Sequence, residues 1–167
     1  MPRIALLLAA VLPAACVQNA ALGDAGGPDL PPLAADAAEP RLALAEHLLA
    51  EYFASDIVAR PTICLAVSDG RSEEALAQAQ ETALVARFPK LAPLSRCTRV
   101  RTAWQDSEDE QPALVFAIHN FSCASTTECS AWASYTAGAT ASPSSLYRMR
   151  YEGFRWQFER DSRRIAE

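Results

Sequence analysis

The chain has 167 residues, of which half are hydrophobic and 21% are charged, and its formal net charge is −5. This acidic balance, without a long basic run, disfavours nucleic acid, and we expect no nucleic-acid partner. The length accommodates one domain with some additional chain, and no apolar run reaches the roughly 20 residues of a membrane-spanning helix.

The first fifteen residues have the pattern of a secretory signal peptide. Arg3 gives a short positive segment, residues 4–12 are apolar, and residues 13–15 are Pro-Ala-Ala directly before Cys16. A polar stretch follows, which disfavours a buried N-terminal helix. We therefore predict that residues 1–15 are a signal peptide and not part of the folded domain.

Residues 12–16, Leu-Pro-Ala-Ala-Cys, resemble the lipobox of bacterial lipoproteins. The resemblance implies cleavage before Cys16 and diacylation of Cys16, which anchors the chain in a membrane. Pro13 departs from the pattern, because an aliphatic residue is usual there. Val17 after the cysteine resembles the outer-membrane sorting class, so the expected location is the periplasm or the outer membrane. The alternative is ordinary secretion with cleavage further on, for instance after residues 21–23.

Residues 16–39 are rich in Ala, Gly, Pro and Asp and have no periodic apolar pattern. Such a segment buries too little surface to offset its ordering entropy, so we predict a disordered tether. A single domain is predicted at residues 40–167. The tether would hold this domain away from the membrane to which Cys16 is attached.

The domain begins with two predicted helices and a strand between them. Pro40 suits a first helical turn, and apolar residues at helical spacing continue to Ile57. Residues 62–68 are apolar on both faces, which predicts a strand covered on both sides. The second helix is predicted from an N-cap at Ser72 to Phe88.

The remainder is rich in predicted strands. Residues 99–104 alternate in polarity, and the acidic run 106–110 is expected to be a solvated turn. Residues 112–121 form the most hydrophobic strand, which we expect to be central. A further strand is predicted at residues 130–137.

An aromatic hairpin closes the predicted domain, with a tight turn at Glu152-Gly153. The large side chains at alternate positions of its strands are Tyr147, Met149, Tyr151, Phe154, Trp156 and Phe158. The element order indicates an α+β fold with two helices packed on one face of an antiparallel β-sheet, a meander that ends in this hairpin.

This architecture is similar to cystatin-like and nuclear-transport-factor-2-like α+β folds over about residues 40–165. The resemblance concerns the order of elements alone, because no residue motif of either family is present. No functional residue is therefore carried over. Such folds host both enzymes and binding modules, so the resemblance implies a fold and not an activity.

Five cysteines are an odd number for an exported protein, but four remain if Cys16 carries lipid. Four cysteines allow three pairings. Cys123 and Cys129 flank a short polar loop between two predicted strands, where a bridge is geometrically easy. Cys64 and Cys97 would then close the loop that contains the second helix. We predict these two disulfides.

The sequence contains no G-x-S-x-G, Walker-type, G-x-G-x-x-G, H-E-x-x-H or C-x-x-C pattern. The one close cysteine pair is C-x5-C without a nearby histidine, so we predict neither a zinc site nor another cofactor. Two histidines could act as a base near neutral pH, and His47 is expected on the surface because it lies off the apolar stripe of its helix. His119 belongs to the predicted central strand, on the face of Ala117 and Phe121. There it is either a structural residue or a general base.

Arg148 and Arg150 fall opposite the aromatic face of the hairpin. They predict a binding patch for an envelope protein, for lipid headgroups or for a polyanionic polymer. The alternative is a solvent-exposed sheet face whose arginines discourage edge pairing.

These observations predict an exported cell-envelope domain, either a lipoprotein or a periplasmic protein, that acts as a non-enzymatic binding or support module. Its expected partners are a membrane, through the lipid on Cys16, and an envelope protein or polyanion, through Arg148 and Arg150. The alternative prediction is a small hydrolase or isomerase that uses His119 in a pocket between the helices and the sheet.

Overall fold

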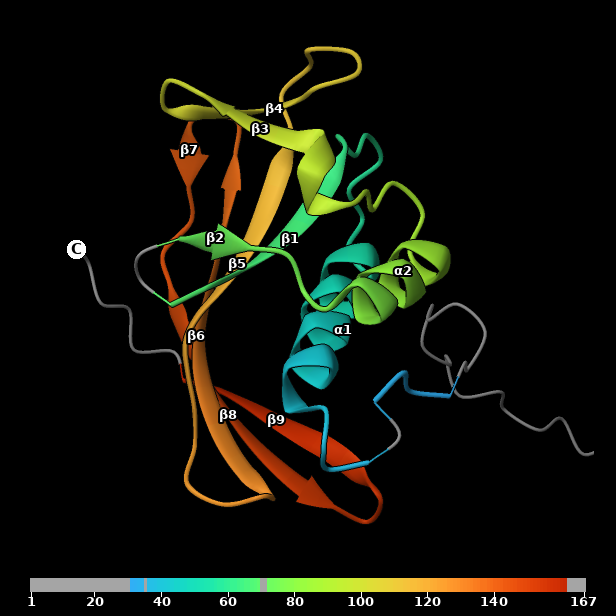
Figure 1. Cartoon of the computed structure of the whole chain (residues 1–167), viewed down its shortest axis with the longest axis vertical. Helices are drawn as coiled ribbons and strands as arrows, with labels where there is room; N and C mark the ends of the chain where they lie inside the picture. Colours follow the sequence, from blue (N-terminus) through green and yellow to red (C-terminus); the bar gives the residue numbers. More distant parts are fainter. Residues whose placement is uncertain (1–30, 35, 70–71, 162–167) are drawn as a thin grey trace, which may run out of the picture.

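The computed structural model describes residues 31–34, 36–69 and 72–161 (Figure 1). Within these residues the elements in chain order are α1 Pro40–Phe53, β1 Ile63–Ser68, β2 Glu73–Glu74, α2 Gln78–Arg87, the 3-10 helix η1 Leu94–Arg96, β3 Cys97–Val100, β4 Ala103–Asp106, β5 Leu114–Cys123, β6 Glu128–Ala137, β7 Thr140–Ala141, β8 Ser145–Glu152 and β9 Arg155–Asp161. The predicted α+β class is therefore confirmed. No helix in the described ranges is long and apolar enough to cross a membrane.

The main sheet of the described chain has the strand order β2-β1-β5-β6-β8-β9, and β7 pairs with β6. Adjacent strands of this sheet run antiparallel, with one exception. Strands β1 and β5 run parallel, with Ile63 opposite Leu114. The predicted antiparallel sheet is thus a mixed sheet. A parallel pair needs a long crossover connection, and the segment with α2, β3 and β4 supplies it.

Both helices cover the same face of this sheet, as predicted (Figure 1). Leu44 and Leu49 of α1 are fully buried there against alternate residues of the central strand β5, among them Phe116 and Ile118. The apolar stripe of α1, at helical spacing, therefore packs on the apolar face of β5, which alternate strand residues form. Trp156 of the hairpin belongs to the same core.

Arg60 stabilises the C-terminal end of α1. Its guanidinium donates hydrogen bonds to the main-chain oxygens of Phe53 (3.0 Å) and Ser55 (2.8 Å). The same group lies 5.1 Å from the centre of the Phe53 ring and 5.7 Å from that of Tyr52. One cation thus satisfies carbonyls left open at the helix end and packs on two aromatic rings.

The second helix begins later than predicted. Residues Glu73–Glu74 form β2, which pairs antiparallel with the edge of β1, and α2 starts only at Gln78. Glu73 also pairs with Arg99 of β3 at 3.0 Å. The open hydrogen-bonding groups of the β1 edge and this ion pair outweigh the local N-cap preference of Ser72, so that prediction was wrong.

A second, smaller core lies on the other face of the sheet, under the two-stranded sheet β3-β4. Trp104 packs there against Cys64, Ala66 and Val115. The predicted strand at residues 62–68 is therefore covered on both sides, as expected. The predicted strand at residues 99–104, in contrast, is a hairpin with its turn at Arg101 and Thr102.

Asp106 was expected in a solvated turn and is instead buried. Its carboxylate accepts hydrogen bonds from Arg96 Nε (2.8 Å) and Nη2 (2.7 Å), from Thr62 Oγ1 (2.5 Å) and from the main-chain N of Glu108 (3.0 Å). These partners, first the Arg96 guanidinium and then Thr62, hold the pKa of Asp106 well below its usual range. The network joins β4 to η1 and to the start of β1.

The N-terminal boundary of the packed domain lies before Pro40. Ala34 is buried in the main core, and the main-chain N of Leu33 donates to Glu46 Oε2 at 2.9 Å. Trp156 Nε1 donates to the main-chain oxygen of Asp36 at 3.2 Å. The described end of the predicted tether therefore contacts the domain. The predicted signal peptide and Cys16 lie outside the described residues.

Candidate functional site

A pocket of about 380 Å³ lies between α1 and the helix-covered face of the sheet. We call it the tyrosine pocket, because Tyr52, Tyr135 and Tyr147 form its aromatic walls. Its remaining lining residues are Leu48, Glu51, Phe116, Ala133, Ser134, Ser142, Pro143, Ser145 and Arg160. The volume lies at the low end of the range for small-molecule sites, so it suits a small ligand.

The helical side of the pocket follows from the spacing along α1. Leu48, Glu51 and Tyr52 stand three and four positions apart, which places them on one face of the helix. Leu48 is buried, whereas half of the Glu51 side chain is exposed. This face therefore gives the pocket an apolar floor and a carboxylate at its rim.

The sheet side follows from cross-strand register. Phe116 of β5 stands opposite Tyr135 of β6, and Tyr147 of β8 stands opposite Arg160 of β9. Opposed residues share one face of a sheet, so these four side chains all face α1. The Phe116 and Tyr135 rings lie 5.8 Å apart, and Tyr135 remains 42% exposed.

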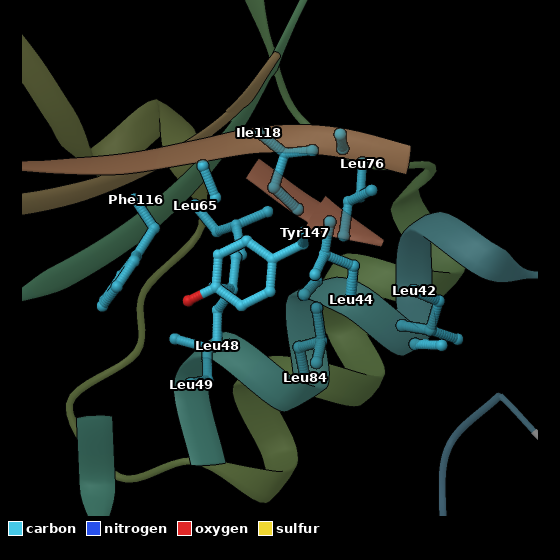
Figure 2. Close-up of a cluster of buried hydrophobic side chains, with 14 of the residues drawn as sticks. Leu42, Leu44, Leu48, Leu49, Leu65, Leu76, Leu84, Phe116, Ile118 and Tyr147 are labelled. Atoms are coloured by element: carbon cyan, nitrogen blue, oxygen red, sulfur yellow. The ribbon is translucent and has the colours of Figure 1, made fainter. Parts of the chain in front are cut away.

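Tyr147 is the buried polar residue at the centre of this arrangement. Figure 2 shows its ring among the leucines of α1 and the apolar residues of β1 and β5. Its hydroxyl donates to Glu51 Oε2 at 3.4 Å. Burial, and next the negative charge of Glu51, raise the pKa of Tyr147 to about 12, so the phenol stays protonated and remains a hydrogen-bond donor.

His47 lies next to the second carboxylate oxygen of Glu51, Oε1. Its Nε2 lies 3.5 Å from Glu51 Oε1, and its ring stacks on Phe158 at 4.1 Å and meets the Tyr147 ring edge-on at 6.0 Å. Burial lowers the pKa of His47, and the Glu51 carboxylate opposes this shift. His47 is therefore a packed positioning residue for Glu51. The prediction of a surface histidine was wrong.

Arg160 provides positive charge to the same pocket. Its Nε donates to Ser145 Oγ at 3.1 Å, and its guanidinium lies 6.0 Å from the centre of the Tyr147 ring. Within the described part of the chain, no carboxylate forms an ion pair with Arg160. The pocket thus places a carboxylate at the hydroxyl of Tyr147 and a guanidinium over its ring.

His119 does not reach this pocket. It shares the sheet face of Val115 and Ala117, which is turned away from the helices, and its Nε2 lies 3.3 Å from Ser144 Oγ. A β-bulge at Asn120 (φ 52°) shifts the register, so Phe121 packs in the helix-covered core instead of beside His119. The predicted pocket histidine and its predicted neighbour Phe121 are therefore on opposite faces.

Arg148 and Arg150 lie beside a second hollow of about 470 Å³ on the same far face. Arg148 pairs with Asp161 (3.5 Å) and Glu159 (4.0 Å). Arg150 likewise pairs with Glu128 (3.4 Å) and Glu152 (3.5 Å). Carboxylates of the same sheet thus compensate both arginines. Their role as a patch for an acidic partner stays a prediction.

The four cysteines of the described chain form the two predicted disulfides. Cys64–Cys97 joins β1 to the start of β3 and is buried in the smaller core. Cys123–Cys129 links directly opposed residues at the β5-β6 hairpin end. Two disulfides are consistent with an exported protein. None of these cysteines lines the tyrosine pocket.

A comparison with known protein families, with curated proteins and with solved structures gives no match for this chain. The resemblance to cystatin-like and nuclear-transport-factor-2-like folds consequently stays a prediction from element order.

Proposed function

We propose that this protein is an exported domain of the bacterial cell envelope that binds a small ligand in the tyrosine pocket. The observation that carries the proposal is the pairing of a protonated, buried Tyr147 with oppositely charged side chains, Glu51 and Arg160, around a partly open cavity. A concave, largely apolar site with a few convergent polar groups is the usual form of a small-molecule site.

The cellular part of the proposal rests on other features. The signal-peptide pattern and the lipobox-like residues before Cys16 support export and membrane attachment. The disulfides Cys64–Cys97 and Cys123–Cys129 support folding in an oxidising compartment. In this proposal the lipid on Cys16 holds the domain at the periplasmic side of the membrane.

The geometry favours binding over catalysis by His119. The alternative hydrolase or isomerase needs this histidine inside the helix–sheet pocket, and His119 lies on the opposite sheet face. His47 is nearer, but Phe158 covers a face of its ring, and its Nε2 faces Glu51. We therefore propose ligand binding in the tyrosine pocket, and not catalysis by His119.

Native mass spectrometry of the full chain tests ligand binding. The protein is incubated with a small-molecule extract of the producing cells and freed of unbound compounds before the spectrum is recorded. We expect a non-covalent adduct that is lost in Tyr135→Ala, which removes an exposed wall of the pocket. The matched control Phe154→Ala removes an exposed ring at the hairpin tip and should keep the adduct. Absence of an adduct, or an adduct equally retained by both variants, would contradict the proposal.

A further inference from the structure

The two charged groups of the tyrosine pocket are placed to hold one ligand of two charges. Glu51 comes from α1 and Arg160 from β9, and both approach Tyr147, one at its hydroxyl and the other over its ring. They do not pair with each other within the described structure, where the nearest basic group to Glu51 is the His47 imidazole, whose pKa burial lowers. Each therefore keeps capacity for an opposite charge on a bound molecule.

The residues around Arg160 and Glu51 indicate which ligand group each would bind. The guanidinium of Arg160 is already oriented by its hydrogen bond to Ser145, which leaves its two terminal nitrogens as a planar fork for a carboxylate. The Glu51 carboxylate contacts His47 and Tyr147. The face of a tyrosine ring such as that of Tyr147 also favours an ammonium group nearby. Both charges lie at the rim, where part of their hydration is kept.

The floor between them is apolar. Leu48, Phe116 and Ala133 line it, and the Tyr52 ring meets Phe116 edge-on at 5.5 Å. A ligand with charged groups at one end and a hydrocarbon or aromatic side chain at the other would fill both parts. Burial of that side chain against these apolar residues favours binding.

We infer that the tyrosine pocket binds a small zwitterion, an α-amino acid with an apolar side chain, whose carboxylate contacts Arg160 and whose ammonium group contacts Glu51. This inference rests on the proposed function and names the class of ligand for the same site. The side chain of the amino acid would lie on Leu48 and Phe116. The Tyr147 hydroxyl would donate to the ligand carboxylate or keep its bond to Glu51.

Calorimetric titration of the full chain with matched probes tests the inference. The probes are leucine and phenylalanine, together with 3-methylbutylamine, which is leucine without its carboxylate, and 4-methylpentanoate, which is leucine without its amine. We expect at least one of the two amino acids to bind, and both leucine analogues to bind at least tenfold more weakly than leucine or not at all. Equal binding of either analogue and leucine would overturn the inference.

Substitutions assign the two charges. Arg160→Gln should weaken amino-acid binding at least tenfold, and Glu51→Gln should do the same while keeping a partner for Tyr147. The control Arg155→Gln neutralises an exposed arginine of the same strand outside the pocket and should change nothing. Thermal melts of each variant verify folding, and the probe comparison on the unchanged protein does not depend on any variant.

The inference and the proposed function can fail separately. If neither amino acid binds but the cell extract yields an adduct lost in Tyr135→Ala, the pocket takes another ligand and the inference alone is overturned. If both the probes and the extract give no binding, both are overturned. Binding of leucine or phenylalanine that Arg160→Gln and Glu51→Gln leave unchanged would place the ligand elsewhere and overturn the inference.

Discussion

The hydroxyl of Tyr147 lies 3.4 Å from Oε2 of Glu51, although the two residues stand 96 positions apart in the sequence. The contact joins the first helix to the last hairpin, and it places a buried phenol next to a carboxylate at the rim of the pocket. The hydrogen-bonding groups that the pocket offers to a ligand, and the high pKa of Tyr147, both depend on this pair.

Tyr147 should ionise well above the ordinary range of a tyrosine. Its pKa is raised to about 12, first by burial and then by Glu51, so any stabilisation linked to it is fully present below pH 10 and is lost as the pH rises towards 12. Ultraviolet absorbance at high pH should show this late step, and Tyr147→Phe should remove it. In Glu51→Gln the step should move to lower pH but remain above the ordinary value, because burial persists. An unchanged late step in Tyr147→Phe would contradict the assignment.

Asp106 should make the fold sensitive to acid. Its folded pKa is lowered, so the stabilisation from its charged form is present above about pH 4 and is lost as the pH falls further, towards the lowered value. Asp106→Asn should reduce stability at neutral pH and flatten the acid dependence of urea unfolding. The exposed Glu110→Gln provides the control and should leave the profile unchanged. An acid profile of Asp106→Asn that matches the unchanged protein would count against this network.

The two disulfides should differ in their contributions to stability. Cys64–Cys97 spans 33 positions and Cys123–Cys129 spans six. In the chain-entropy model the longer loop is worth about 3–4 kcal/mol and the shorter about 2 kcal/mol. Paired Cys→Ser variants in denaturant unfolding should preserve that order. A larger loss for the short bridge would show that strain or packing, and not loop closure, dominates.

Phe154 should be replaceable with a gain in stability. It occupies the second central position of the β8-β9 turn at φ 65°, after Gly153 at φ 58°, and its side chain is 88% exposed. Left-handed backbone costs an ordinary residue roughly 1–2 kcal/mol, and asparagine tolerates it better. Phe154→Asn should raise the free energy of unfolding by about 0.5–1 kcal/mol. Phe154→Ala keeps the backbone cost and should not gain; an equal gain in both would exclude the turn conformation as the cause.

Most of the fold could be predicted because local periodicity reports burial directly. The helix from Pro40 and the central strand near Phe116 follow from spacing that the structure confirms. The hairpin is also present, but its turn is Gly153-Phe154, one residue later than predicted, so the prediction of Phe154 as a strand residue was wrong. The disulfide pairs followed from the order of elements. The helix, strand and turn depend on residues that are close in the sequence. The disulfides depend on loops whose ends are set by the elements on either side.

The rest depended on contacts that sequence spacing does not encode. Ser72 carries a helix-start signal, but the free edge of β1 draws the next residues into a strand. The parallel pairing of β1 with β5 and the bulge at Asn120 arise from sheet register, and the bulge alone separates Phe121 from His119.

The candidate site was missed for the same reason. His47 and Glu51 stand four positions apart on α1, which was a readable signal for a helical pair. Nothing in the sequence showed that Tyr147 and Arg160 would line the same pocket as Glu51, because that depends on the pairing of β8 with β6 and β9.

The most direct test of the central claim, an exported and disulfide-stabilised binding domain, is the intact mass of the protein from membrane and soluble envelope fractions, with and without reduction and alkylation. We predict a chain that starts at Cys16 and carries a diacyl group in the membrane fraction, with four alkylatable thiols that appear only after reduction. A chain that retains residues 1–15 and has free thiols before reduction would contradict the claim.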